Sequence, residues 1–168
     1  DTDRSMDLLI NLFFTQTMNQ LCTYADERCA DSRLPVPVRF FMDDFATNCR
    51  IDNFENMISN IRSRKISAIL ILQSLSQLEQ SYDMGAHTIV DDCDTMIYMG
   101  GNDPKTASSI ATRCNKTTQT ILHMPLCTSW TFRRGAQPFM CRNMELDDYL
   151  HQKGIVTKWM REAQVYME

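Results

Sequence analysis

The feature that most constrains the fold is a strand-like apolar run followed by a helical stretch, repeated three times along the chain. The three runs are "VRFFMDD" (38–44), "ISAILILQS" (66–74) and "DTMIYMGG" (94–101), and the helical stretches fall at about 53–63, 76–93 and 103–115. Runs that are apolar throughout are typical of strands buried on both faces. Their alternation with helices predicts right-handed crossovers and an α/β fold, with a mostly parallel sheet flanked by helices.

The remaining segments predict additions to this sheet. Residues 5–28 predict a helix whose apolar side chains cover more than one face, so its first turns are expected to be buried. From about residue 116 the pattern becomes extended around a turn, which predicts a hairpin on the sheet edge. Residues 141–168 predict a helical tail with a break at Gly154. Without an internal repeat or a linker, residues 1–168 are predicted to form one domain.

Composition excludes several classes of protein. The 168 residues carry a net charge of −4, which argues against a uniformly basic nucleic-acid binder. Seven cysteines, an odd number without a CxxC pair, predict free and mostly buried thiols and no structural zinc. Four methionines are expected in the core: Met42, Met57, Met96 and Met99. No run reaches the roughly 18 apolar residues of a membrane span, so the segment itself is expected to be soluble.

Polar or glycine-rich groups follow each of the three predicted strands. The first strand ends in Asp43 and Asp44, the second in Gln73 and Ser74, and the third in residues 100–103, "GGND". In open parallel sheets, ligands bind just beyond the carboxyl ends of the strands. The three strand ends together therefore predict a binding or catalytic site.

An apolar strand that ends in two carboxylates has the form of a Walker B strand. In that interpretation Asp43 holds Mg²⁺ through water, because Mg²⁺ prefers oxygen ligands and keeps part of its hydration shell. Asp44 orients and deprotonates the attacking water, and Gln73 positions that water or senses the γ-phosphate. The plainer alternatives remain open at this point: the acidic pair caps the next segment, and Gln73 is a turn residue.

Two further features concern the nucleotide. Arg62 lies at the end of the helix between the first two strands, where it either complements the helix dipole or serves as an arginine finger in a neighbouring subunit. The sequence contains no G-x-x-x-x-G-K-[ST] loop. Because that loop cradles the β- and γ-phosphates, the chain is expected to carry half of a nucleotide site and to be a piece of a longer protein.

The ordered set of these motifs resembles TraG/TraD-like type IV secretion coupling proteins, the ATPases that transfer DNA in conjugation. The resemblance covers about residues 1–140. It rests on an acidic pair followed by Phe-Ala (43–46), Arg62, the motif Gln-Ser-x-x-Gln-Leu (73–78) and the motif Gly-Gly-Asn-Asp (100–103). The resemblance implies a RecA-like P-loop NTPase fragment that lacks the Walker A segment, which lies upstream in this family.

The resemblance also implies a function. A hexameric motor beneath a membrane anchor, on the cytoplasmic side of the bacterial plasma membrane, would use ATP and Mg²⁺ to deliver relaxase-bound single-stranded DNA to type IV secretion channel proteins. Asp43 would then be the metal carboxylate and Asp44, Gln73 and Arg62 catalytic positions, while Gly100, Gly101 and Asn102 would bind nucleotide. The fragment alone is expected to be inactive as an ATPase.

One departure and three alternatives accompany this interpretation. The family usually has Asp-Glu where this chain has Asp43-Asp44, and aspartate is one methylene shorter, so a closer strand end or a relaying water would be needed. The alternatives are another RecA-like translocase of the chromosome-partitioning type, a non-enzymatic α/β docking module, and a metal-dependent phosphatase. A P-loop upstream would argue against the docking module.

Overall fold

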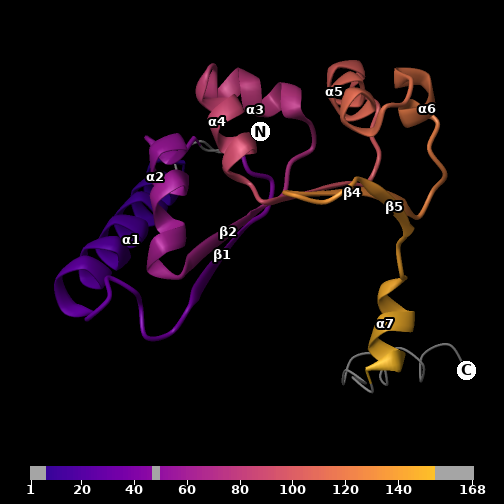
Figure 1. The fold of residues 1–168 in the computed structure, drawn as a ribbon. Coiled ribbons are helices and arrows are strands. Elements are labelled where there is room, and N and C mark those ends of the chain that lie inside the picture. Colours follow the sequence, from indigo (N-terminus) through magenta and orange to yellow (C-terminus); the bar gives the residue numbers. More distant parts are fainter. Residues whose placement is uncertain (1–6, 47–49, 154–168) are drawn as a thin grey trace, which may run out of the picture.

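Helices and strands alternate through most of the chain. The computed structural model describes residues 7–46 and 50–153 (Figure 1). The elements are α1 (Asp7–Arg28), β1 (Val38–Met42), α2 (Phe54–Ile61) with the 3₁₀ turn η2 (Arg62–Arg64), β2 (Ile66–Leu70), α3 (Leu75–Tyr82), α4 (Gly85–Asp92), β3 (Thr95–Tyr98), α5 (Pro104–Cys114), α6 (Thr118–Leu122), β4 (Thr128–Arg133), β5 (Phe139–Arg142) and α7 (Leu146–Gln152). The predicted break at Gly154 lies outside the described residues.

Local capping explains where the central helices begin. Ser74 caps α3 by accepting a hydrogen bond from the backbone N–H of Gln77, and Asp103 caps α5 by accepting one from Thr106. Pro104 occupies the first turn of α5, where its missing N–H costs nothing. Asn115 ends α5 in the left-handed conformation that favours asparagine or glycine.

The strands form two sheets. β1 and β2 pair in parallel with Val38 opposite Ile66 and Met42 opposite Leu70, as the sequence predicts. β3 pairs with β4, and β4 with β5, both antiparallel. The predicted hairpin is found as β4–β5, but the first part of the segment predicted to be extended forms the short helix α6. Within the described ranges, β3 does not continue the parallel sheet, because it pairs with β4 and not with β2.

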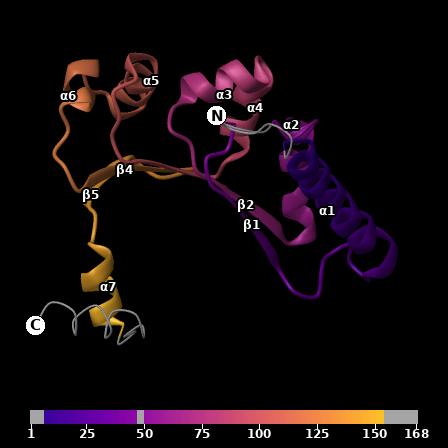
Figure 2. The ribbon, with the colours of Figure 1, turned by 180° about the vertical axis from the view of Figure 1, so that it is seen from behind.

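One face of the strands is covered and the other is open. Helices α2 to α6 gather on one side of the strands and α7 lies on the other, as the two opposite views show (Figures 1 and 2). Burial consequently alternates along β1, where Phe40 and Met42 are buried while Phe41 is 67% exposed. Ile97 on β3 is 60% exposed. The predicted burial on both faces is wrong for the described chain, because α2 to α6 cover one face and Phe41 and Ile97 on the other face stay exposed.

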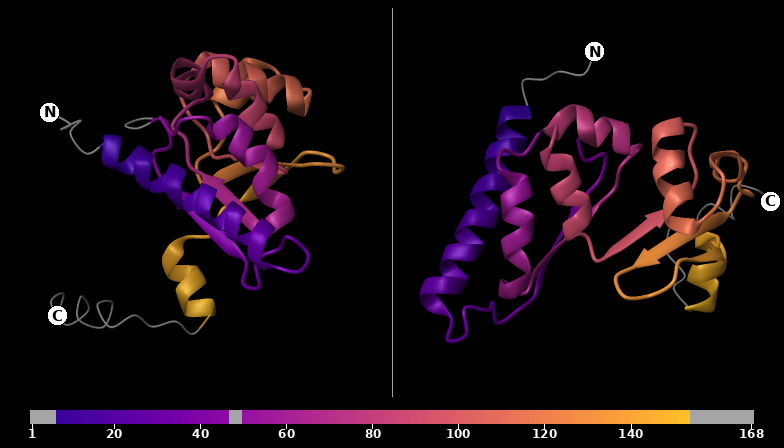
Figure 3. Two further views of the ribbon diagram at one scale, coloured as in Figure 1. Left: turned by 90° about the vertical axis from the view of Figure 1, so that its left-hand side faces the viewer. Right: turned by 45° about the horizontal axis from the view of Figure 1, so that its top comes forward.

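The buried residues form two clusters. The larger contains Phe54, Leu78 and Ile89 and is built from α1 to α4 with β1 and β2. The smaller contains Tyr98, Ala107, Ile110, Ala111, Ile121 and Phe132 and joins β3 and β4 to α5 and α6. Figure 3 shows α1 and α2 running side by side at one end of the molecule, with α5 and α6 at the other. Whether residues 1–168 act as one domain stays a prediction.

Several packing predictions are corrected. The first turns of α1 are largely exposed, with Leu8 at 74%, because α1 packs on the outer side of α2 and little of the described chain covers its start. Met42 and Met57 are buried, but Met99 is exposed beyond the end of β3. The described cysteines are free, and none of them is fully buried. No helix among the described residues combines the length and apolar character needed to cross a membrane.

Candidate functional site

The ladder between β1 and β2 continues past the strand ends. The N–H of Ile71 donates to the carbonyl of Met42 over 2.9 Å, and the N–H of Phe45 donates to the carbonyl of Ile71 over 2.9 Å. These two bonds hold the acidic pair, Asp43 and Asp44, next to the carboxyl end of β2. The residues that follow both strands therefore lie at one edge, as expected of a parallel pair.

The structure brings Asp44 and Gln73 into contact. Nε2 of Gln73 donates a hydrogen bond to Oδ1 of Asp44 over 3.1 Å. Asp43 lies beside them, and its Oδ1 accepts the backbone N–H of Asp44 over 3.1 Å. Both carboxylates are exposed at this edge. Three of the predicted site residues thus form one polar cluster.

The donor set fits a partly hydrated Mg²⁺ rather than a caged metal. The described ranges contain no group of three or more His, Cys, Asp or Glu side chains placed to hold a metal ion. One or two exposed carboxylates supplemented by water and phosphate oxygens are what Mg²⁺ usually takes. Asp43 and Asp44 supply that minimum.

Phe45 and Ala46 anchor the acidic pair to the core, a role that sequence reasoning missed. The Phe45 ring stacks on Tyr82 with centroids 5.5 Å apart and contacts Phe54 at 4.8 Å. Ser81 donates to the carbonyl of Ala46 over 2.8 Å. The backbone of Asp44 has a φ of 49°, a left-handed conformation that a tight turn demands. The Phe-Ala that follows the acids is therefore the anchor of this turn.

The carboxyl ends of β2 and β3 are tied together by a hydrogen-bonded clamp. Oδ2 of Asp103 accepts from Ser76 Oγ over 2.7 Å and from Thr106, whose Oγ1 in turn accepts the N–H of Leu75 over 3.0 Å. The hydrogen bonds from Thr106 and Ser76 lower the pKa of Asp103 to about 2. The last residue of the Gly-Gly-Asn-Asp motif is thus a structural clamp, which the sequence alone did not indicate.

The glycines of that motif have different requirements. Gly100 has a φ of +104°, a conformation that side chains with a Cβ rarely adopt. Gly101 does not, and a Cβ there would meet only the Tyr98 hydroxyl at 3.8 Å. The clamp holds Gly100, Gly101 and Asn102 on the same side as Gln73, but no described contact joins them to Asp43 or Asp44. Their nucleotide role stays a prediction.

Arg62 lies at the opposite end of β2 from Gln73. Its Nη1 pairs with Asp94, just before β3, at 3.3 Å, and its side chain is 76% exposed. The structure therefore does not bring Arg62 to the acidic pair of its own chain. Its place at the end of α2 and its pairing with Asp94 fit the helix-dipole interpretation as well as a role toward another molecule.

Two buried polar atoms near the strand ends lack a partner within the described chain. They are Oε1 of Gln77, on α3, and the hydroxyl of Tyr98, at the end of β3. Burial, with the nearby Asp103 carboxylate adding to it, raises the pKa of the Tyr98 hydroxyl. Unsatisfied buried polar groups are uncommon in folded proteins, and each calls for an explanation.

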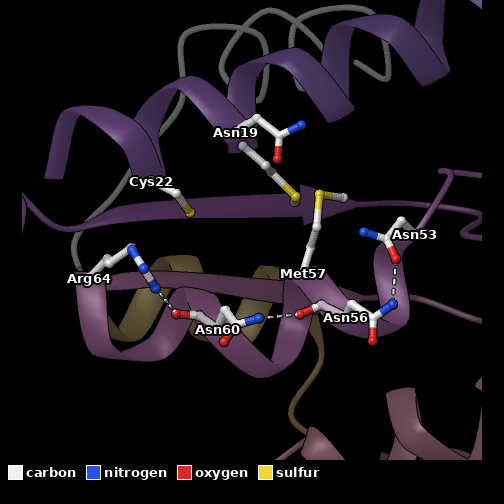
Figure 4. A pocket seen from close by; sticks show the side chains of 8 residues that line it. Asn19, Cys22, Asn53, Asn56, Met57, Asn60 and Arg64 are labelled. Carbon is white, nitrogen blue, oxygen red and sulfur yellow. Dashed lines mark hydrogen bonds between the residues drawn. The ribbon is translucent and has the colours of Figure 1, made fainter. Parts of the chain in front are cut away.

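A hollow lies elsewhere, between α1 and α2. It has a volume of about 380 Å³ and is lined by Met18, Asn19, Cys22, Asn53, Asn56, Met57, Asn60 and Arg64 (Figure 4). Asn53, Asn56, Asn60 and Arg64 are linked by hydrogen bonds along α2 and η2. Asp26 binds the Arg64 guanidinium through both carboxylate oxygens, which neutralises its charge. The hollow is therefore separate from the acidic edge and offers little to an anion.

Comparison with protein families and comparison with solved structures each gave matches. A family model described as the TraM recognition site of TraD and TraG matches residues 37–123, just over half of the chain. Comparison with curated proteins gave no match. Several of the solved structures that match are forms of the conjugative coupling protein TrwB.

The TrwB structures share the fold of this chain. The trigonal form of TrwBΔN70 in complex with sulphate has a TM-score of 0.70 at 16% identity and covers 83% of this chain and 37% of that chain. TrwB with the ATP analogue ADPNP gives 0.66 at 17% identity, with the same coverage. TrwB with ADP and Mg²⁺ gives 0.64 at 16%, covering 83% and 38%. This chain thus spans less than two fifths of those TrwB chains.

Proposed function

This chain belongs to the family of the TraM recognition site of TraD and TraG, the C-terminal part of conjugative coupling proteins, and on that premise we propose that it carries the Walker B half of an ATP site. The observation that carries the proposal is the cluster of Asp43, Asp44 and Gln73 at the carboxyl ends of two parallel strands. TrwB, which shares the fold, is described in complexes with an ATP analogue and with ADP and Mg²⁺.

Each member of the cluster has a role in this proposal. Asp43 would hold Mg²⁺, and the metal would supply charge neutralisation at the phosphates. Asp44 accepts the proton of the attacking water, and Gln73 fixes the carboxylate and the water relative to each other. The hydrogen bond from Gln73 to Asp44 gives the pair a defined starting geometry.

The turn geometry gives a physical account of aspartate at position 44, where the family usually has glutamate. Asp44 lies at a φ of 49°, in the left-handed region. Aspartate is several-fold enriched there among residues other than glycine, because its short side chain bonds locally. A shorter acid on a tighter turn reaches the same edge with less backbone strain than glutamate would incur.

The phosphates require a segment that this sequence does not contain, and the facing open edges of β2 and β3 indicate where it would pair. Within the described ranges, β1 pairs with one edge of β2 and β4 with one edge of β3, and the other edges have no partner. The Ser76–Asp103 clamp holds the two strands together at one end and the Arg62–Asp94 pair at the other. We place the P-loop strand between β2 and β3.

Two observations support that placement. The buried Oε1 of Gln77 and hydroxyl of Tyr98 lie near the carboxyl ends of β2 and β3, and the N–H groups of a loop could satisfy them. The apolar side chains of Phe41 and Ile97 would then face the remainder of a longer polypeptide instead of water. The chain alone is accordingly expected to hydrolyse little or no ATP.

In the assembled protein, Arg62 would act as an arginine finger toward the neighbouring subunit of a hexamer. Its exposure and its distance from the acidic pair of its own chain support this role over one within the same subunit. The proposed motor delivers relaxase-bound single-stranded DNA to a type IV secretion channel from the cytoplasmic side of the membrane. The name of the family model, TraM recognition, indicates contact with a relaxosome protein as a further partner.

The test uses the full-length protein that contains this sequence and a P-loop. We expect Asp44→Asn to reduce kcat for ATP hydrolysis by roughly 10²-fold or more, in the range of a lost general base. Asp43→Asn should raise the Mg²⁺ concentration needed for half-maximal rate. Asp31→Asn, an exposed acid on the loop after α1, is the matched control. Parent-like hydrolysis by Asp44→Asn, or a full-length protein without a P-loop, would reject the proposal.

A further inference from the structure

A chain of three side chains ends at Asp44. Nε2 of Gln77 donates to Oε1 of Gln73 over 3.4 Å, and Nε2 of Gln73 donates to Oδ1 of Asp44 over 3.1 Å. We propose that Gln77 is a positioning residue, which keeps the Gln73 amide turned with its NH₂ group toward the carboxylate. This inference rests on the proposed ATP site, but its structural half can be tested without it.

The direction of the chain follows from the chemistry of its groups. An ionised carboxylate only accepts hydrogen bonds, so Gln73 must present its NH₂ group to Asp44. That leaves Oε1 of Gln73 as an acceptor, and a fixed donor on its far side holds the amide in this orientation. The Nε2 of Gln77 is that donor. Without it, Gln73 can turn over and place its own oxygen against the carboxylate, which loses one hydrogen bond and adds repulsion.

The position of Gln77 in α3 also supports a positioning role. Ser74 is the N-cap of α3, its side chain accepts the N–H of Gln77 over 3.2 Å, and Gln77 is the third helical residue. Ser-x-x-Gln is the sequence of a capping box, in which the glutamine would return a bond to the N–H of Ser74. Here Oε1 of Gln77 has no partner in the described chain, and its Nε2 goes to Gln73 instead. The Gln77 side chain therefore does not complete the capping box and bonds to Gln73 instead.

This arrangement also explains why glutamine rather than glutamate suits position 77. Glutamate is the better residue at the start of a helix, because it completes a capping box and complements the helix dipole. It cannot donate a hydrogen bond to Gln73 at neutral pH. A residue that only stabilised α3 would tolerate Gln77→Glu, whereas a residue that positions Gln73 would not.

The first experiment compares Gln77→Glu and Gln77→Met in the full-length protein, with Gln80→Met as the control. Gln80 is exposed on the same helix and has no side-chain partner in the described chain. We expect both Gln77 variants to lower kcat roughly 10-fold at nearly unchanged KM, as a displaced catalytic group does. Gln77→Glu should match or exceed the parent in thermal stability. A rate loss that only follows a loss of stability would overturn the proposal.

A double-mutant cycle then shows whether Gln77 acts through Gln73. In the Gln73→Ala background, Gln77→Met should cost nothing further, because the residue that it positions is gone. Additive losses would mean that Gln77 acts independently and would reject the positioning role.

A second readout separates this inference from the proposed function. In the 168-residue chain itself, the side-chain NH₂ resonances of Gln73 should shift in Gln77→Met and stay in place in Gln80→Met, as followed by ¹⁵N NMR. Shifted resonances in this chain, together with a full-length protein that hydrolyses no ATP, would support the positioning role and reject the proposed function. Unchanged resonances would reject the positioning whatever the activity.

Discussion

Gln73 donates a hydrogen bond to Asp44 over 3.1 Å, although 29 residues separate the two in sequence. The bond forms because β1 and β2 are parallel and in register, with Met42 opposite Leu70, so both residues follow their strands at one edge. An acid that follows a strand can be a simple cap, and the hydrogen bond from the next strand is the observation on which we base the proposal of a site. This pair therefore has the preorganisation that a catalytic group needs.

We predict that the two arginines of η2 separate stability from activity. Arg64 binds both oxygens of Asp26, at 2.9 and 2.7 Å, and its side chain is only 22% exposed. Arg64→Ala should lower the free energy of unfolding by about 1–2 kcal/mol, whereas Arg62→Ala should change it by less than about 0.5 kcal/mol. Urea denaturation of the chain measures both.

The same pair tests the arginine finger in the full-length protein. Arg62→Ala should reduce ATP hydrolysis strongly at parent-like stability, with the defect rescued in mixed oligomers where a neighbour supplies the arginine. Full activity of a uniformly Arg62→Ala oligomer would rule out the finger.

Gly100 and Gly101 should respond differently to the same substitution. Because Gly100 has a φ of +104°, Gly100→Ala should destabilise the chain by about 1 kcal/mol or more. Gly101→Ala meets no such strain and should stay within about 0.5 kcal/mol of the parent. Thermal melting of the two variants side by side gives the comparison, and equal losses would show that the backbone conformation at Gly100 is not the cause.

Asp103 should make stability depend on pH in acid. Its pKa is about 2 in the folded chain, because Thr106 and Ser76 donate hydrogen bonds to it, and lies near 3.9 in an unfolded one. The lowered pKa contributes stability that is fully present above about pH 4 and is lost as the pH falls from 4 toward 2. After allowance for solvent screening, the contribution is on the order of 1 kcal/mol.

The control for this effect is Asp103→Asn, which keeps an N-cap side chain but does not titrate. Urea midpoints measured from pH 6 to pH 2 should fall less steeply in Asp103→Asn than in the parent below pH 4. Parallel curves of urea midpoint against pH would show that the hydrogen bonds to the Asp103 carboxylate do not contribute to stability.

Phe45 should matter for stability and, through the turn, for the acidic pair. Phe45→Ala removes a buried ring that packs on Phe54 and Tyr82, and should cost about 3 kcal/mol. Phe45→Leu retains most of the volume and should cost about 1 kcal/mol. Chemical denaturation orders the variants, and a Phe45→Ala protein as stable as Phe45→Leu would contradict the anchoring role.

The positions of the acidic pair and of Gln73 could be predicted because they depend on one rule, that carboxyl ends of parallel strands share an edge. The clamp at Asp103 could not, because Ser76, which donates to Asp103, and Leu75, whose N–H donates to Thr106, belong to another helix, and no sequence pattern gives the distance to that helix. Capping signals indicated where α5 starts, but not that the capping carboxylate also joins two strands.

Two predictions from the sequence are wrong, the first for a local reason and the second for a long-range one. "TQTIL" has β-branched residues typical of strands, yet forms the short helix α6, because Thr117 caps it by accepting the N–H of Thr120. Phe41 and Ile97 belong to runs that read as doubly buried, yet they are exposed. The hydrophobic pattern of a strand indicates which side chains the strand can bury. The number of layers that cover the strand depends on other parts of the polypeptide.

The two separate cores have a consequence for how the molecule unfolds. Phe54 and Leu78 belong to one cluster and Ile110 and Ile121 to the other, and side-chain bonds such as Ser76–Asp103 join them across unpaired strands. Cooperativity requires extensive shared contact, so the larger and smaller clusters are expected to melt as two units in this chain. A strand added between β2 and β3 would merge them into a single transition. The shape of a melting curve would then show whether a strand occupies that position, without an enzymatic assay.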